Sequence, residues 1–221
     1  MGRGNPGDGA VDRRYCPPVD HVLLARLERF YNAVAAAGAD VEPMRAVTLF
    51  VRPGGRHPLY ARPSGEPTVA DLSAVRARQR ELGVPEAFEW VHEALDERDS
   101  EFNPPVGDDL AEEQRAHRAG SIASALAPDG DAMASGLYQR AVHSPDAADI
   151  VEVVGVATLP AARKRGLGAA VTAALAHHAL SNGASLVFLS AHGEDVARVY
   201  ERVGFHRVGT ACIAEPVAPV N

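Results

Sequence analysis

Residues 149–170, DIVEVVGVATLPAARKRGLGAA, determine the expected fold of this chain. They begin with an apolar run that predicts a strand, break at Pro160, and pass through a basic, glycine-rich loop into an alanine-rich helix. In such a strand–loop–helix unit, the loop amides and the positive helix end converge on an anion, and glycine lets the backbone come close to it. The stretch therefore predicts a phosphate-binding turn.

The pattern on either side predicts a mixed α/β fold. Residues 133–142 and 150–159 are typical of an antiparallel hairpin, and the apolar run 186–189 is typical of a buried strand in parallel pairing. Tyr31 belongs to the apolar stripe of the first expected helix. Helices are expected at 20–37, 68–82, 167–180 and 194–203, with further strands at 46–51, 59–61, 87–92 and 205–214. Segment 93–128 is irregular, with a helix expected at 110–126.

The composition excludes several classes of partner. The 221 residues carry a net charge of -7 and no basic face outside the loop, which argues against nucleic acid. No apolar run is long enough to span a membrane, and the first residues lack the apolar segment of a secretory signal. Cys16 and Cys212 lie far apart, without the spacing of a metal site. We expect a cytoplasmic protein with free thiols and no metal.

Three local motifs resemble the Gcn5-related N-acetyltransferase (GNAT) family. Residues 163–168, RKRGLG, match the family's R/Q-x-x-G-x-G/A motif, and the strand and proline before them, VATLP at 156–160, have the right offset. Downstream, residues 197–205, ARVYERVGF, resemble the family's A-x-x-Y-x-x-x-G-F helix end. Each motif alone is short, but all three follow in order, each on its expected element.

The resemblance implies a GNAT-like fold, a mixed and mostly antiparallel sheet with flanking helices and a central parallel pair. It implies an acetyl-CoA-binding core at 133–214 and an N-terminal part of the domain on the acceptor side at 19–132. Residues 1–18, rich in glycine, proline and arginine, are expected to be a flexible tail, and residues 215–221 a second tail. The expected activity is acetyl transfer from acetyl-CoA to an amine of a small molecule or a peptide. Assembly as a homodimer is left open.

The resemblance also implies where acetyl-CoA binds. Backbone groups of Val156, Ala157 and Thr158 would face the pantetheine arm, at the point where the family's strand separates from its neighbour. The loop and first helical turn would hold the pyrophosphate, through Arg163, Lys164, Arg165, Gly166, Leu167, Gly168 and Ala169. The alternative is a structural glycine turn, with the arginine side chains solvated.

Two residues are candidates for proton transfer. Tyr200 would protonate the departing CoA thiolate, since a phenol has a pKa near 10; the alternative is a half-buried tyrosine with a satisfied hydroxyl. Glu152 would accept the proton of the acceptor amine, and period-two alternation predicts it on the same face as Val154 and Val156. Its alternative is an exposed glutamate on an open sheet face.

Other functions fit the residues differently. A Rossmann dinucleotide site is rejected because Val171 stands where a third small residue is required. The nine histidines form no metal pair and no nucleophile motif is present, so direct transfer in a ternary complex is preferred over an acyl-enzyme. A protein that keeps the fold to sense acyl-CoA, or for decarboxylation or cyclisation, stays open. The segment 93–128 does not match the family, and Glu194 replaces a common asparagine.

Overall fold

The structure of the protein, a computed structural model, describes residues 19–52, 60–97, 122–127, 130–141 and 144–216. The helices are α1 (His21–Ala36), α2 (Val69–Leu82), α4 (Leu167–Ser181) and α5 (Glu194–Glu201), with short 3₁₀ segments η1 (His92–Glu97) and η2 (Pro160–Ala162). The strands are β1 (Asp40–Met44), β2 (Val47–Val51), β3 (Arg62–Pro63), β4 (Phe88–Val91), β5 (Ile122–Leu126), β6 (Ala132–Arg140), β7 (Ile150–Thr158), β8 (Leu186–Phe188) and β9 (Ala211–Ala214).

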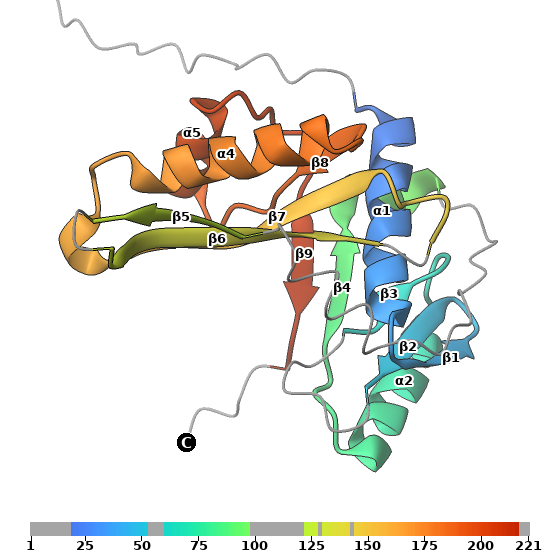
Figure 1. Cartoon of the computed structure of the whole chain (residues 1–221). Coiled ribbons are helices and arrows are strands. Elements are labelled where there is room, and N and C mark those ends of the chain that lie inside the picture. The colour runs from blue at the N-terminus through green and yellow to red at the C-terminus, as the bar shows by residue number, and fades with distance from the viewer. Residues whose placement is uncertain (1–18, 53–59, 98–121, 128–129, 142–143, 217–221) are drawn as a thin grey trace, which may run out of the picture.

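The central sheet has the strand order β5-β6-β7-β8, in which only β7 and β8 run parallel (Figure 1). The hairpin of β6 and β7 and the parallel pairing of β8 are as the sequence predicts, and they confirm the mixed α/β fold class. In Figure 1, α4 lies along one side of this sheet, and α1 stands across its end beside β4. The basic loop joins the far end of β7 to the start of α4.

The parallel pair separates after a short contact. Its register joins Ile150 to Leu186, Val151 to Val187 and Glu152 to Phe188, and no pairing with β8 follows although β7 continues to Thr158. Beyond Glu152, β7 therefore pairs with β6 alone, and its other edge carries open backbone groups. Glu152 occupies the branch point of this fork.

A β-bulge in β7 lies next to the fork. Leu137 pairs with Val154 and Ser135 with Ala157, so β7 carries one more residue than β6 in this interval. Gly155 adopts a φ of 62°, a conformation that glycine reaches without the steric cost of a side chain. The extra residue shifts the alternation of side chains beyond it.

The bulge corrects one expectation from the sequence. Glu152 contacts α1 through Tyr31, whereas Val156 packs into the cluster that Val151, Val153, Val171 and other residues form beneath α4. Glu152 and Val156 therefore lie on opposite faces, and the prediction of a shared face is wrong. The alternation fails because the bulge inserts a residue between them.

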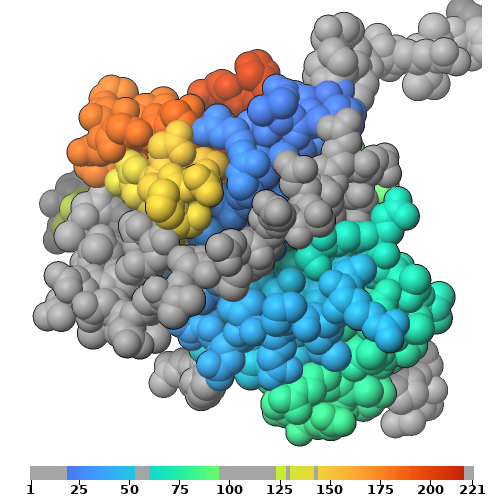
Figure 2. Space-filling model, turned by 90° about the vertical axis from the view of Figure 1, so that its right-hand side faces the viewer, coloured from blue at the N-terminus to red at the C-terminus, as the bar shows by residue number. Residues whose placement is uncertain are grey.

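The N-terminal elements form a second unit against α1. Strands β1, β2 and β3 make an antiparallel sheet, on which α2 packs, and β4 pairs with β9. Figure 2 shows the N-terminal part of this unit as one surface, coloured from blue to green. Asp20 caps α1, and Thr68 with Asp71 forms the expected capping box of α2. A core of α1, η1, β7 and β8 residues joins this unit to the central sheet.

Other expectations are corrected. The strand that pairs with β2 on this side is Arg62–Pro63 rather than 59–61. Residues Ile122–Leu126, expected in a helix at 110–126, form strand β5, and the rest of that helix and the tail 1–18 lie outside the described residues. The last strand is only Ala211–Ala214, and it pairs with β4 instead of joining the central sheet.

Candidate active site

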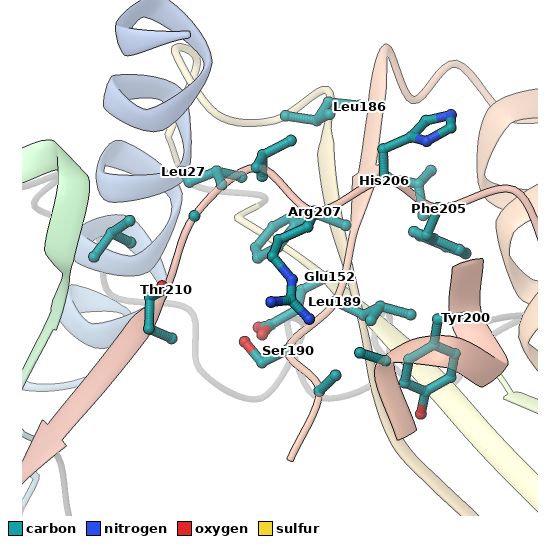
Figure 3. Close-up of a pocket in the computed structure, with 18 of the residues that line it drawn as sticks. Leu27, Glu152, Leu186, Leu189, Ser190, Tyr200, Phe205, His206, Arg207 and Thr210 are labelled. Carbon is teal, nitrogen blue, oxygen red and sulfur yellow. The ribbon is translucent and has the colours of Figure 1, made fainter. Parts of the chain in front are cut away.

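A cavity of about 1150 Å³ lies beside the free edge of β8 (Figure 3). One wall comes from α1, with Leu27 and Tyr31, and the opposite walls come from α5, with Tyr200, and from the segment that leads into β9. Glu152 and Ser190 lie in its interior part in Figure 3. A concave, largely apolar space with a few converging polar groups is typical of a small-molecule site.

Glu152 is a buried carboxylate with a partner at each oxygen. Its residue is 6% exposed, Tyr31 donates to Oε1 at 3.1 Å, and Gln139 donates to Oε2 at 2.7 Å. Burial raises the pKa of Glu152 to about 7, although the two hydrogen bonds act in the opposite direction. A carboxylate whose pKa lies near neutral pH can both accept and release a proton, as a general base must. The alternative of an exposed glutamate is wrong.

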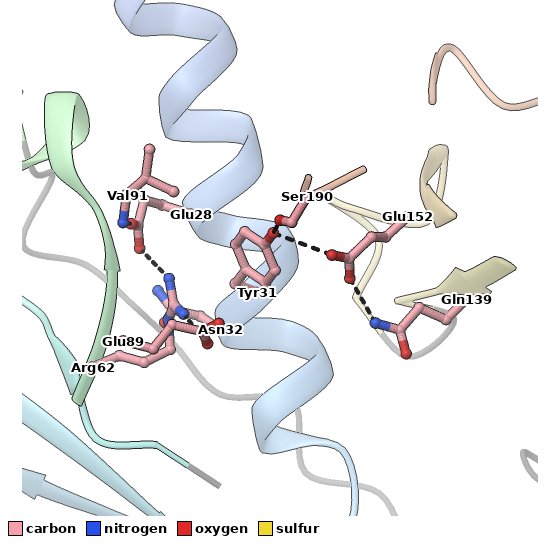
Figure 4. Close-up of polar contacts among 9 residues, drawn as sticks. All are labelled: Glu28, Tyr31, Asn32, Arg62, Glu89, Val91, Gln139, Glu152 and Ser190. Carbon is pink, nitrogen blue, oxygen red and sulfur yellow. Dashed lines mark hydrogen bonds and ion pairs between the residues drawn. The ribbon is translucent and has the colours of Figure 1, made fainter. Parts of the chain in front are cut away.

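The partners of Glu152 belong to a larger polar network (Figure 4). The hydroxyl oxygen of Tyr31 also lies 3.0 Å from the hydroxyl oxygen of Ser190. The Tyr31 ring stacks against the guanidinium of Arg62, whose central carbon is 5.0 Å from the ring centroid. Arg62 in turn forms ion pairs of 2.7 Å with both Glu28 and Glu89. The network thus connects the candidate base to β3 and β4 of the N-terminal unit.

The sequence did not reveal this network. It placed Tyr31 only in the apolar stripe of a helix, and Gln139, Ser190 and Arg62 carried no motif. The spacing offers no signal, since Tyr31 and Glu152 are 121 positions apart. One local signal was present: a tyrosine in the apolar stripe brings a hydroxyl into the packed face, and a buried hydroxyl requires a partner.

Tyr200 lines the cavity from α5, and Figure 3 draws Leu189 between it and Glu152. Burial raises the pKa of the phenol, so it is neutral and can donate. Its ring packs edge-on against Phe205, with centroids 6.4 Å apart. Among the described residues its hydroxyl has no hydrogen-bond partner, which disfavours the alternative of a satisfied structural tyrosine.

The basic loop has the geometry of an anion-binding turn. Lys164 has a φ of 61°, and Gly166, the N-cap of α4, has a φ of 78° and provides no side-chain cap. The first amide to bond back within the helix is that of Ala170, to the carbonyl of Gly166, so the amides of Leu167 to Ala169 are open. These amides, at a positive helix end, suit a phosphate group.

The arginine side chains of the loop have local contacts. Nε of Arg163 donates to the carbonyl of Thr158 at 3.3 Å, and Arg165 approaches the sulfur of Met133 at 3.6 Å. These contacts hold the loop against the ends of β7 and β6. Any anion contact in the loop therefore rests mainly on its backbone amides.

The structure brings some predicted site residues together and separates others. Glu152 and Tyr200 both line the cavity. No residue of the basic loop or of the end of β7 lines it. The open edge of β7, which includes Val156, Ala157 and Thr158, runs from the branch point at Glu152 to the loop. A molecule that contacts both the cavity and the loop must extend along this edge.

Comparison with known proteins gives a family. A model of the acetyltransferase (GNAT) family matches residues 85–205. A mycothiol acetyltransferase of Rhodococcus erythropolis is 33% identical over 129 residues, which make up 56% of this chain and 38% of that protein. The chain thus spans well under half the length of this relative.

Solved structures share the fold. A GCN5-related N-acetyltransferase from Kribbella flavida superposes with a TM-score of 0.62 at 20% identity, over 89% of this chain and 96% of that one. A GNAT-family structure from Novosphingobium aromaticivorans gives a TM-score of 0.51 at 15% identity, over 87% and 99% of the two chains. Within the described residues, no group of metal-binding side chains gathers, and no helix is long and apolar enough to cross a membrane.

Proposed function

Because this chain belongs to the acetyltransferase (GNAT) family, we propose that it transfers an acetyl group from acetyl-CoA directly to an amine acceptor held in the same complex. The observation that carries the proposal is the position of Glu152. Its buried carboxylate, with a pKa of about 7, lies where β7 and β8 separate and faces a cavity of about 1150 Å³.

Acetyl-CoA supplies the acetyl group, and two parts of the chain near the fork bind different parts of it. The amides of Gly166 to Ala169, with the positive end of α4, hold the pyrophosphate. The open backbone edge of Val156 to Thr158 hydrogen-bonds the pantetheine arm, since no strand of the described structure occupies that edge. This arrangement points the thioester toward Glu152.

Glu152 and Tyr200 have opposite tasks. An ammonium group must lose a proton before its nitrogen can attack, and Glu152 accepts that proton in its ionised form. Tyr200 stays neutral and donates its hydroxyl proton to the departing thiolate. In this mechanism no residue forms a covalent intermediate with the acetyl group.

The acceptor is an amine of a small molecule or a peptide. The relative from R. erythropolis is a mycothiol acetyltransferase, which supports a small-molecule acceptor. We place the acceptor in the part of the cavity between α1 and the segment before β9, because this part reaches Glu152 from the side away from the loop.

The test is release of free CoA thiol from acetyl-CoA, with and without a panel of amines. We expect release that depends on at least one amine, with kcat/KM falling as the pH drops through about 7, because protonation of Glu152 removes the base. Glu152→Gln keeps the size of the side chain but cannot accept a proton. It should lower turnover by roughly 10²-fold or more and remove the part of this acid limb that the titration of Glu152 causes.

Both proteins must be assayed with one acceptor, because the acceptor's own titration also lowers the rate at acid pH. Equal turnover and equal pH profiles would remove Glu152 from the mechanism. Tight acetyl-CoA binding without thiol release for any amine would instead favour an acyl-CoA sensor.

A further inference from the structure

The cavity beside Glu152 carries an excess of negative charge. This inference rests on the proposed function, in which an amine acceptor occupies this cavity. Within the described structure, the acidic residues of its lining are Glu89, Glu152, Glu194 and Glu201, and its one arginine is Arg207. Arg207 pairs with Glu194 at 2.9 Å, so it does not balance the others. Such a lining favours a cationic ligand.

The ion pair of Glu89 leaves one carboxylate in excess. Arg62 forms ion pairs of 2.7 Å with both Glu28 and Glu89, so one guanidinium meets two carboxylates. The remaining nitrogen of the guanidinium, Nε, donates to the amide oxygen of Asn32 at 2.9 Å. All three nitrogens of Arg62 are therefore engaged, and one negative charge of the group stays unbalanced.

This unbalanced charge is presented to the cavity by Glu89. Glu28 is buried, and its Oε1 accepts from the backbone amide of Val91 at 2.6 Å while its Oε2 accepts from Arg62. Glu89 lines the cavity, with 24% of its side chain exposed. Its Oε2 accepts from Arg62, and its Oε1 has no hydrogen-bond partner in the part of the chain that the structure describes. Glu89 thus offers the cavity a charged oxygen that can accept a hydrogen bond.

Glu89 and Glu152 are held apart by the side chains that connect them. The hydroxyl of Tyr31 donates to Glu152, and the ring of Tyr31 stacks on Arg62, which pairs with Glu89 (Figure 4). Burial is the main cause of the raised pKa of Glu152, and the charge of Glu89 adds to it. A phenol ring and a guanidinium thus separate two carboxylates that line one cavity. A ligand that contacts both must carry a polar group at each end of a chain.

Tyr60 adds a second polar group near Glu89. The chain just before β3 lies beside β4, because the amide of Glu89 donates to the carbonyl of Ala61 at 3.0 Å. Tyr60 also lines the cavity, and its hydroxyl has no hydrogen-bond partner among the described residues. Burial raises the pKa of this phenol, and the charges of Glu215 and Glu89 raise it further. The hydroxyl is therefore neutral, and its oxygen can accept a hydrogen bond from an ammonium group.

We propose that Glu89, assisted by Tyr60, makes the acceptor site selective for amines that carry a second ammonium group. One amine of such an acceptor gives its proton to Glu152 and attacks the thioester. The other amine stays protonated and donates a hydrogen bond to Oε1 of Glu89. A monoamine of the same length places a methyl group there and leaves the carboxylate without this partner. The two acceptors thus differ by one charge-assisted hydrogen bond.

The test compares α,ω-diamines with monoamines of the same chain length, for example cadaverine with pentylamine. For the wild type and the diamine of the best length, we expect kcat/KM for acetyl transfer to be about 10-fold or more above that of its monoamine. Two reactive ends alone would account for a much smaller difference. Calorimetry with CoA present should show the same preference in Kd, without any need for turnover.

Glu89→Gln removes the charge and keeps an oxygen that can accept from Arg62. The diamine preference should fall about 10-fold or more, to what two equivalent ends explain. The two amines are compared within one protein, so a displacement of Glu152 affects both and cancels in the ratio. Glu86→Gln is the matched control, because Glu86 is 19% exposed, pairs with Arg76 at 2.7 Å and does not line the cavity. It should keep the wild-type ratio.

Tyr60→Phe keeps the ring and gives a second reading if Glu89→Gln fails to fold. Its diamine preference should fall several-fold, because one of the two acceptors for the ammonium group is lost. A preference that is unchanged in folded Glu89→Gln, or in Tyr60→Phe, would overturn the site as stated.

The outcomes separate this inference from the proposed function. No thiol release by the wild type with any amine overturns the proposed function, whereas the calorimetric comparison still decides whether the cavity prefers diamines. Thiol release at equal kcat/KM for every diamine and its monoamine leaves the proposed function intact and overturns this inference alone.

Discussion

Arg62 is an ionised side chain in the interior of the protein, with 1% of its surface exposed. Moving a charge out of water is costly unless ion pairs and hydrogen bonds replace its hydration. Arg62 meets this condition through Glu28 and Glu89 at 2.7 Å, and through Asn32 at 2.9 Å. It also supports the ring of Tyr31, so the stability of the N-terminal unit and the geometry of the site depend on the same residue.

Replacing this arginine should therefore cost both stability and order at the site. In Arg62→Leu the carboxylates of Glu28 and Glu89 lose their cation, and we expect the free energy of unfolding to fall by about 3–5 kcal/mol in urea titration. Arg80→Leu is the control, since Arg80 pairs with Glu86 while more than half of its side chain is exposed. It should change stability little. Equal losses in the two variants would contradict the structural role of Arg62.

At the scale of the element, the bulge in β7 depends on a pair of glycines. Gly155 supplies the positive φ, and Gly136 lies opposite it on β6. A Cβ at position 136 would lie 2.9 Å from Cγ2 of Val156 and 3.2 Å from side-chain atoms of Val171 and Leu175. The bulge brings Val156 into the space that a side chain on β6 would otherwise fill.

Gly136→Ala should consequently strain the contact between the sheet and α4. We expect a loss of about 1–3 kcal/mol in the free energy of unfolding, as for other overpacked cores. Gly65→Ala is the matched change, because its Cβ would meet the nearest atom, Cβ of Ala46, at an ordinary 3.6 Å. A Gly136→Ala protein as stable as Gly65→Ala would show that α4 shifts freely over the bulge.

The elements that the sequence predicts well are those that local chemistry defines. Asp20 and Thr68 predict where their helices begin, because their side-chain oxygens cap backbone amides of the first turn. Proline and aspartate predict the turn between β6 and β7. The bulge was missed because a single glycine in a strand also fits regular pairing. The pairing of β9 with β4 was missed because nothing local selects one sheet edge over another.

In the candidate site, too, some residues could be predicted from the sequence and others could not. Glu152 and Tyr200 were predicted because the family's motifs stand close to them in the sequence. Tyr31 and Arg62 were not, because their roles arise from contacts between α1, β3 and β7 that the chain makes only on folding. The function of Glu152 remains a prediction that the assay of Glu152→Gln addresses, and the role of Tyr200 likewise remains a prediction.

At the scale of the whole molecule, the fork leaves the central sheet incomplete on one side. The edge of β7 beyond Glu152 and the outer edge of β8 have no strand partner among the described residues, and the cavity follows the second of these. Hydrogen bonds that the sheet does not make are thus available to a bound molecule. Binding in the fork should complete the sheet.

We therefore expect CoA to stabilise the protein, by about 2.7 kcal/mol at a concentration 100 times its Kd. The stabilisation should be lost in Gly168→Trp, since a Cβ at position 168 would lie 3.5 Å from Oγ1 of Thr158 and the indole would fill the space between the loop and the end of β7, where we place CoA. Ser181→Trp, an equally large change at the exposed other end of α4, should keep it. Thermal unfolding with and without CoA measures the shift. A full shift in a folded Gly168→Trp protein would contradict the assignment of the loop.

The network around Glu152 also bears on how such a protein can evolve. The motifs that mark the family lie in the C-terminal half, whereas Tyr31 and Arg62 come from the N-terminal half. Recombination that exchanged the first half for that of a distant cousin would preserve every recognisable motif and the bond from Gln139, and yet remove Tyr31 and Arg62 from the surroundings of the carboxylate. A gene assembled from parts would inherit the motifs without this half of the network.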